Sequence, residues 1–521
     1  MTVEASIWAP FRRRAFRWLW LGMMVSTVGT WMQTVGAQWL LVDAPNAAVL
    51  VSLVQAASTL PVMLLALPGG VLADSFDRRW LLLTVQIYFL AVACLLVVLT
   101  VAGAMPPSLL LALTFALGAG VAVQHPGWQS LIPELLPRTQ LRAAARLHMV
   151  SVNLARSVGP ALAGLVIARL SVPFVFAVNA ASVMFFALVL LLWRRPLGGS
   201  PARERFLPAL RAGGRYVWNE PVVRRVMLRS ALFIAPAMAL WGLLPLIASR
   251  RLGLGADGFG ALFGALGVGA VLGALVLGRV RTHLTTNGML GAAGTLYAAA
   301  QAAIVLAPGF LAALVTLLLA GLAWTAVMST LNAELQLFLP AWVRARGLGL
   351  YLVVVTGSQA LGALLWGLVA DGTGLESALL MAAAAVLAGV LAGLVWPVPQ
   401  TEQLDLQPVV WPDARLAFEP EPQAGPVVVA VEYTVRSERE ARFLEAMAPL
   451  RRSRLRTGAS RWELYRDGAR PDRFVEFFTV PSWDEHVRQH GGRLTAEDRA
   501  LETTAYAFSD PPPRADHLLP P

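Results

Sequence analysis

Arg156 is a charged side chain inside the apolar run 147–168. It lies nine residues from the start of that run, which is roughly 13 Å along a helix that rises 1.5 Å per residue. A charge at that depth in a bilayer is costly and needs a partner or a wet cavity. Arg156 could therefore recognise an anion or control gating, or it could pair with Glu134 or Glu334 and lock the helices together.

Glu334 is an acid within an apolar stretch, between Asn332 and Gln336. It could take up and release a proton. The alternative, which its position near the end of the stretch favours, is an ion pair with Arg344 or Arg346.

Signatures of enzyme chemistry are missing from the chain. It has no Walker A sequence and no Ser-His-Asp or H-E-x-x-H arrangement. His486 and His490 are four residues apart on a predicted helix and could hold a metal, but no third ligand has suitable spacing, so a solvated helix face is favoured. Cys94 is the one cysteine. The sequence therefore predicts no catalytic residues, no cofactor and no metal site.

The composition explains why these polar residues stand out. Of the 521 residues, 57% are hydrophobic and 14% are charged, whereas soluble domains carry about 25% charged residues. The net charge of +11 comes from arginines in short clusters between apolar runs rather than from one basic face, so nucleic acid is not an expected partner. The expected partner is the lipid bilayer, because the composition predicts a polytopic membrane protein.

Twelve segments are long and apolar enough to cross a bilayer core, which needs about 20 residues per helix. Their extents are 18–42, 48–72, 80–102, 108–132, 147–168, 174–193, 226–249, 259–280, 288–306, 310–338, 347–370 and 375–396. Residues 194–225 separate six segments from six, which predicts an N-terminal half (1–193), a linker (194–225) and a C-terminal half (226–396).

Arginines are unevenly distributed between the two sides of these segments. One side carries 21 arginines, the central linker included, and the other carries three: Arg169, Arg250 and Arg251. By the positive-inside rule, both chain ends and the linker should face the cytoplasm. The linker should be partly helical and lie near anionic headgroups.

The two halves repeat each other at an offset of 203 residues. Gly70 then matches Gly273, and Arg78 matches Arg281. The stretch Gly159-Pro160-Ala-Leu-Ala-Gly164 matches Gly362-Ala-Leu-Leu-Trp-Gly367. The repeat predicts duplicated halves with a solute path between them, and it marks Gly159, Pro160, Gly164, Gly362 and Gly367 as helix-packing residues.

The segment Gly70-Val-Leu-Ala-Asp74-Ser-Phe-Asp77-Arg78-Arg79 resembles the loop motif G-x-L-A-D-x-x-G-R-R of the major facilitator superfamily. Asp77 replaces the usual glycine, and Leu277 replaces the acid in the second half. The resemblance implies a gating loop made of Gly70, Asp74, Arg78 and Arg79. In it Asp74 would meet a helix N-terminus of the other half when the cytoplasmic side is closed.

A narrower resemblance, to the enterobactin-exporter-like branch, rests on the segments 131–137, 153–164 and 339–346. It implies an exporter. The spans that usually line the path in this superfamily offer Gln33, His125 and Trp324, together with Trp31, Gln38, Trp128 and Trp241. The tryptophans suit a bulky, partly aromatic solute, or they could be interfacial belts and packing residues.

The C-terminal region is organised differently. Residues 397–425 are rich in proline and acids and should form a linker, whereas 426–510 alternate as strand, helix, two strands and two helices, followed by a tail (511–521). This order resembles a small ferredoxin-like domain of the antibiotic-biosynthesis-monooxygenase type, and the resemblance implies self-association through the sheets.

Together these patterns predict an all-α polytopic membrane protein of twelve transmembrane helices with an added α+β domain. The expected function is secondary-active export of a small amphipathic molecule, such as a siderophore or drug-like compound, coupled to protons, in the bacterial cytoplasmic membrane. The alternatives are an importer of the same fold, and a membrane-tethered enzyme or sensor that acts through the C-terminal domain.

Overall fold

The computed structural model describes residues 8–193, 206–399, 407, 409, 418 and 420–520. For Asp74, Arg138, 206–210 and 212 the description is confined to the backbone. Of the first predicted linker (194–225), residues 194–205 therefore lie outside the described residues. Of the second (397–425), most of 400–419 lies outside them.

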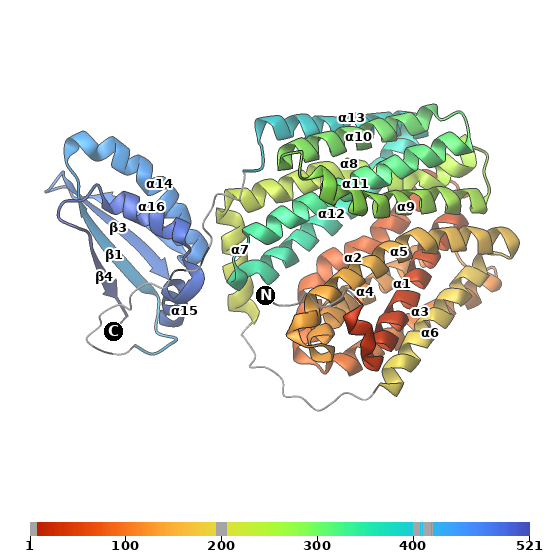
Figure 1. The fold of residues 1–521 in the computed structure, drawn as a ribbon, viewed down its shortest axis with the longest axis horizontal. Helices are drawn as coiled ribbons and strands as arrows, with labels where there is room; N and C mark the ends of the chain where they lie inside the picture. The colour runs from red at the N-terminus through yellow and green to blue at the C-terminus, as the bar shows by residue number, and fades with distance from the viewer. Residues whose placement is uncertain are drawn as a thin grey trace. The chain divides into compact units, whose positions relative to one another are not determined.

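All twelve predicted spans form helices. In the first half these are α1 (Arg14–Leu40), α2 (Ala47–Ser75), α3 (Arg78–Val101), α4 (Pro107–Leu135), α5 (Leu141–Arg169) and α6 (Val172–Leu192). In the second half they are α8 (Pro221–Leu246), which continues into a π-helical turn (Ile247–Arg251), α9 (Ala256–Val280), α10 (Thr286–Leu306), α11 (Phe310–Phe338), α12 (Ala341–Thr373) and α13 (Leu375–Val395). Figure 1 shows the two halves as groups coloured red to yellow and green to cyan. Helix α7 (Phe206–Asn219) lies in the linker between them.

Eleven of these helices, within the described chain, are long and apolar enough to cross a membrane, and α1 is not among them. Hydroxyl residues lower its hydropathy, but Thr27, Thr30 and Thr34 each donate a hydrogen bond to a carbonyl of their own helix, at 2.7–3.1 Å. Such bonds satisfy the hydroxyl groups without water.

Helix α1 packs closely on α6 through glycines that recur every seven residues. A Cβ added to Gly22 would lie 2.6 Å from the Phe186 ring, and one added to Gly36 would lie 3.2 Å from Phe176. Gly29, between them, faces Ser182 and Asn179. Small residues let membrane helices approach closely, so α1 is built into the bundle of the first half.

The predicted repeat appears as equivalent contacts. A Cβ on Gly159 of α5 would lie 2.7 Å from Trp31 on α1, and its repeat partner Gly362 of α12 faces Ala235 on α8, with 2.7 Å to the Ala235 Cα. Gly164 approaches Gly260 of α9, and Gly367 likewise approaches Ser52 of α2. At the 203-residue offset, α1, α2 and α5 correspond to α8, α9 and α12. The glycines of α5 and α12 therefore pack against equivalent helices.

The C-terminal domain contains β1 (Val427–Thr434), α14 (Glu440–Thr457), β2 (Arg461–Arg466), β3 (Arg473–Val480), α15 (Trp483–Arg488), α16 (Ala496–Tyr506) and β4 (Arg514–Leu518). The sheet order is β2-β3-β1-β4, with every pair antiparallel and Val431 opposite Glu476. Helices α14 and α16 lie on one face of the sheet (Figure 1). Tyr433, Phe443 and Phe478 are buried in its core.

Strand β4 falls in the segment that the sequence analysis assigned to a tail. It pairs with β1, Val428 opposite Leu518. The sequence Arg-Ala-Asp-His-Leu lacks an apolar alternation because β4 is an edge strand with mostly exposed residues.

The chain divides into two compact units. One comprises Met1–Arg203, Met227–Leu331 and Tyr351–Pro397, and the other Glu204–Val226, Asn332–Leu350 and Val398–Pro521. The second unit therefore combines the C-terminal domain with α7, the first residues of α8, and the junction between α11 and α12.

Candidate transport site

Arg156 is half-buried on α5 and is held by neutral groups. Its Nη2 donates a 2.7 Å hydrogen bond to Asn153 Oδ1, and its guanidinium carbon lies 6.0 Å from the ring centroid of Trp241 on α8. Its Nε is buried without a hydrogen-bond partner. Among the described residues of its unit, no carboxylate pairs with Arg156, and Glu134, one expected partner, binds Arg78 instead.

An aromatic cluster extends from Trp241 across both halves. The ring centroid of Trp241 lies 5.3 Å from that of Trp324 on α11 and 5.5 Å from that of Phe263 on α9. Phe263 in turn lies 6.1 Å from Trp31 of α1. Three of the predicted tryptophans, Trp31, Trp241 and Trp324, therefore belong to one cluster beside a cation. Such a cluster can accept an aromatic or apolar body next to an anionic group.

Several buried polar atoms next to this cluster in sequence have no hydrogen-bond partner in the described structure. They are both amide atoms of Gln38 and Oγ1 of Thr325. Gln38 precedes Trp39, which stacks on Phe259 at 5.8 Å. An unmet buried hydrogen bond costs about 1–3 kcal/mol, so these groups favour a polar ligand.

Two of the predicted path residues lie in the core of the first half. Gln33 accepts a hydrogen bond from Asn179 Nδ2 of α6, and Trp128 is buried with its ring 6.3 Å from that of Phe186. Their observed contacts indicate helix packing. His125 is exposed on α4.

The loop motif has a different shape from the one expected. Gly70 and Asp74 belong to helix α2, which continues to Ser75, so they do not form a tight loop. The turn consists of Phe76 and Asp77, and Asp77 Oδ1 accepts from the backbone N–H of Arg79 at 3.0 Å and of Trp80 at 3.1 Å. Asp77, which replaces the usual glycine, is the N-cap of α3. The Asp74 side chain lies outside the described residues.

The two arginines of the motif fasten this turn to its own half. Arg78 forms an ion pair with Glu134 near the end of α4. Arg79 donates hydrogen bonds of 2.9 Å to the carbonyls of Leu190 and Leu191 at the end of α6, where helix carbonyls lack internal partners. Arg78 thus holds the turn against a neighbouring acid, Glu134.

Two of the predicted packing residues of α5, Pro160 and Gly164, lie at the contact between the halves. A Cβ on Gly260 of α9 would lie 2.6 Å from the carbonyl oxygen of Pro160 and 2.8 Å from the Gly164 Cα. A Cβ on Gly267 would lie 2.5 Å from the Cα of Ser157, the residue after Arg156. Arg156 therefore sits beside the surface on which the two halves meet.

Glu334 is half-buried on α11 and belongs to the second unit, whereas Arg156 belongs to the first. The sequence placed Arg344 near Glu334, and Arg344 Nε donates to the carbonyl of Leu339 at 3.1 Å. A proton-carrying role for Glu334 stays a prediction.

The histidines of the C-terminal domain do not form a solvated helix face, contrary to the sequence prediction. His486 is 2% exposed, and its ring centroid lies 4.5 Å from that of His490 and 4.9 Å from that of His517 on β4. In the described part of the chain, no group of three His, Cys, Asp or Glu has the arrangement of a metal site. Burial, followed by the neighbouring histidines, lowers the pKa of His486 to about 3.

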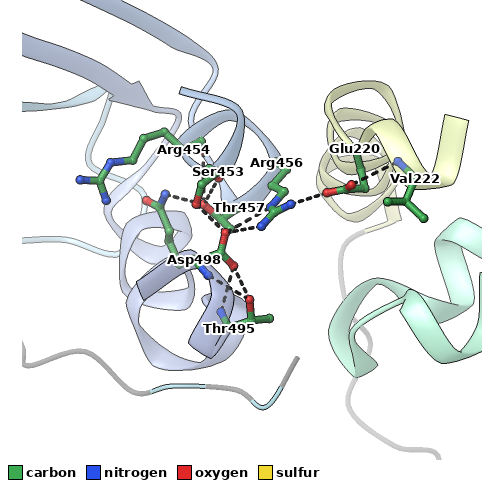
Figure 2. Close-up of polar contacts among 9 residues, drawn as sticks. Glu220, Val222, Ser453, Arg454, Arg456, Thr457, Thr495 and Asp498 are labelled. Carbon is green, nitrogen blue, oxygen red and sulfur yellow. Dashed lines mark hydrogen bonds and ion pairs between the residues drawn. The ribbon is translucent and has the colours of Figure 1, made fainter. Parts of the chain in front are cut away.

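A buried ionic network joins α14 to α16 and reaches α7's C-terminal neighbour, Glu220 (Figure 2). Arg456 Nη2 lies 2.7 Å from Asp498 Oδ1, and Arg456 also pairs with Glu220. Burial alone would raise the pKa of Asp498, but Arg456 and hydrogen bonds from Ser453 and Thr495 outweigh it and lower that pKa. These contacts make α14 and the linker parts of one unit.

Known proteins resemble this chain over most of its length. Residues 5–520 match the family model described as transmembrane secretion effector. The staphyloferrin A transporter of Staphylococcus aureus is 27% identical over 43% of this chain and 56% of its own length. The chain thus spans just over half of that relative. The multidrug efflux pump Tap of Mycolicibacterium fortuitum is 26% identical over 74% of this chain and 95% of its own length.

Solved structures show the same fold. A crystal structure of the nucleoside transporter NupG aligns with a TM-score of 0.59 at 11% identity, over 72% of this chain and 99% of that one. A POT family peptide transporter aligns with a TM-score of 0.57 at 13% identity, over 74% and 96%. Given the family match over nearly the whole chain and the duplicated six-helix halves, the protein belongs to the transmembrane secretion effector family of major facilitator superfamily transporters.

Proposed function

We propose that this transporter exports a small amphipathic solute, of the siderophore or drug-like class, by alternating access in the bacterial cytoplasmic membrane. Relatives named as efflux proteins support the export direction, and the relative named as a staphyloferrin A transporter supports the solute class. The distribution of arginines supports cytoplasmic chain ends.

The observation that carries the proposal is the contact of Arg156 with Trp241. The cation has no acidic partner in its described unit and faces an aromatic ring of the other half. An anionic group on a solute would supply the missing charge, while Trp241 and Trp324 would pack against its apolar body. The site thus suits a molecule with both parts.

Alternating access requires the two halves to rock about a tight contact. The close approach of α5 and α9 at Gly164 and Gly260 supplies one, and its repeat equivalent joins α2 to α12 at Ser52 and Gly367. We propose that Gly70, Asp74, Arg78 and Arg79 stabilise one state of the cycle, and that Glu334 or His125 carries the coupling proton.

The C-terminal domain is proposed to be a non-enzymatic, self-associating module of the antibiotic-biosynthesis-monooxygenase type. The sheet face opposite α14 and α16 carries Val428, Val475 and Phe477, which are only partly buried. Tyr465 packs edge-on against Phe477 at 6.0 Å on that same face. A second copy could cover this surface.

The test is solute accumulation in cells that lack their own pumps, with a panel of siderophores and drugs, for the full chain and for a deletion of 398–521. An exporter lowers accumulation, and the deletion retains some of that effect. Raised accumulation would indicate an importer. An unchanged accumulation for the whole panel, together with a chemical change in a solute that depends on 398–521, would indicate a tethered enzyme. Arg156→Ala in the full chain should abolish the effect.

A further inference from the structure

A pocket of about 530 Å³ lies within the second unit, between the end of α7, the start of α8, and the α14–β2 segment of the C-terminal domain. Its lining includes Trp218, Arg224, Met447, Arg451, Arg452 and Trp462. Small-molecule sites range from about 300 to 1,000 Å³. The pocket is therefore large enough for part of an amphipathic molecule.

The charge around the pocket is positive and unneutralised. Arg224, Arg451 and Arg452 are exposed, and none of them forms an ion pair in the described structure. Two other arginines of α14 are paired with acids instead: Arg454 lies 3.2 Å from Glu476, and Arg456 pairs with Asp498. The pocket arginines are thus free to bind an anion, whereas their neighbours are used inside the domain.

Apolar groups lie beside these charges. Met447 is buried at the pocket floor, and Leu455 and Leu464 line it. The Arg451 guanidinium lies 5.7 Å from the ring centroid of Trp462. The combination of a cationic rim with an apolar floor matches a ligand that carries an anionic head and a hydrocarbon part.

The pocket also lies where a membrane helix begins. Helix α8 starts at Pro221 and is one of the helices able to cross the membrane. Trp218, which is 75% exposed, precedes that start and Arg224 follows it. Tryptophan and arginine at the end of a membrane helix are typical of the headgroup layer, which makes a lipid headgroup a suitable ligand for the rim.

We propose that this pocket binds an anionic phospholipid, with its phosphate held by Arg224, Arg451 and Arg452 and its upper hydrocarbon against Met447, Leu455 and Trp462. The lipid would bridge the linker and α14, beside the Arg456–Glu220 ion pair that already joins them. This goes beyond the transport proposal and does not depend on the solute.

The experiment is native mass spectrometry of the full chain in detergent, titrated with phosphatidylglycerol or with phosphatidylcholine of the same acyl chains. The test variant is Arg451→Gln with Arg452→Gln. The matched control is Arg439→Gln with Arg442→Gln, because these exposed arginines lie three residues apart at the start of α14 and do not line the pocket. Both variants lose the same charge.

We expect phosphatidylglycerol to bind more tightly than phosphatidylcholine, and the test variant to weaken it about 25-fold, or roughly fivefold per arginine. The control should bind as the wild type does. Equal weakening of both lipids, or equal effects of both variants, would overturn the proposal. Competition by inorganic phosphate at millimolar concentration would show a free-anion site instead of a lipid site. An unchanged melting temperature establishes that the test variant is folded.

Discussion

Arg156 differs from Arg78 and Arg251 in having no acidic partner among the described residues of its unit, and from Arg229 in facing an aromatic ring of the other half. Arg78 pairs with Glu134, and Arg251 lies 3.1 Å from Glu376. Arg156 has an amide oxygen and an aromatic ring instead. A cation balanced by neutral groups keeps more of its field for a mobile anion than one already paired, which is why we assign recognition to Arg156.

Arg156→Ala should reduce transport at least about tenfold, because hydrogen bonds to a charged group contribute about 1.5–3 kcal/mol. Arg229→Ala is the matched control. Arg229 lies on α8 and donates to Asn287 at 3.1 Å and to the Gly393 carbonyl at 3.3 Å, so it is used in packing. Flux into liposomes with matched amounts of protein measures the difference. Equal flux for both variants would remove the special role of Arg156, and failure of Arg156→Ala to enter the membrane would make it structural.

At the scale of elements, hydropathy predicted the helices well because every span must bury its backbone polar groups within itself. It failed where local signals compete. The pair Gly69-Gly70 is typical of a turn, yet α2 runs through both residues, and Gly69 lets α2 approach the backbone of Ala122 on α4. A glycine that permits close helix packing and a glycine that permits a turn look the same in one sequence.

The site was only partly predictable for a related reason. Trp31, Trp241 and Trp324 were named from the spans that carry them, but Phe263 and Asn153 complete the site from helix faces that no spacing indicated. Likewise His517 reaches His486 through β4, a strand without apolar alternation. Contacts between distant segments depend on register and helix rotation, which the sequence leaves open.

The buried His486 makes the stability of the C-terminal domain depend on pH. Its pKa of about 3 in the folded domain lies below the value of about 6.5 for an unfolded chain. The folded state thus holds His486 neutral, and below pH 6.5 the unfolded state gains a proton that the folded state does not. The contribution of neutral His486 to the free energy of unfolding should be constant above pH 6.5. At pH 5 the free energy of unfolding should be lower by about 2 kcal/mol.

Hydrogen exchange of β1 and β3 peptides in the full chain, corrected for the intrinsic pH dependence of exchange, measures this loss. His486→Phe should flatten it between pH 6.5 and 5. The exposed His283, in the turn after α9, provides the control His283→Gln, which should keep the full pH dependence. The same slope in His486→Phe and in the wild type would assign the pH dependence to other groups.

At the scale of the whole molecule, the two halves meet backbone to backbone. Because the Gly260 Cβ position is 2.6 Å from a carbonyl oxygen and 2.8 Å from a Cα, neither neighbour can rotate away. Gly260→Leu should therefore separate α5 from α9 and reduce transport by tenfold or more, while the protein still inserts. Gly291→Leu on α10, where no atom lies within 4 Å of a Cβ, is the control. Flux in liposomes, with cross-linking between α5 and α9, would show whether the contact matters: equal flux for both variants contradicts it.

The position of Asp74 in α2 is electrostatically unfavourable for that helix, which points to a role elsewhere in the molecule. It lies in the last turn of α2, which ends at Ser75, and an acid near a helix C-terminus is disfavoured by about 0.3–1 kcal/mol. Asp77, three residues on, is already the N-cap of α3. The turn gains its cap from Asp77 and its fastening from Arg78 and Arg79, and we propose that Asp74 serves a contact made in only one state of the cycle.

Asp74→Asn should then have opposite effects on the helix and on the cycle. Loss of the charge relieves α2, so the variant should reach the membrane in normal amounts. Loss of a contact worth about 1.4 kcal/mol in one state shifts a two-state ratio about tenfold, so transport should fall and the population should move toward the state open on the side of the N-terminus. Asp77→Asn is the matched control, because asparagine is an equally good N-cap and should transport normally. Flux on matched amounts of protein, with cross-linking between the halves near the α2–α3 turn, separates the outcomes. If Asp74→Asn behaves like Asp77→Asn in both measurements, the motif serves only to fasten the turn.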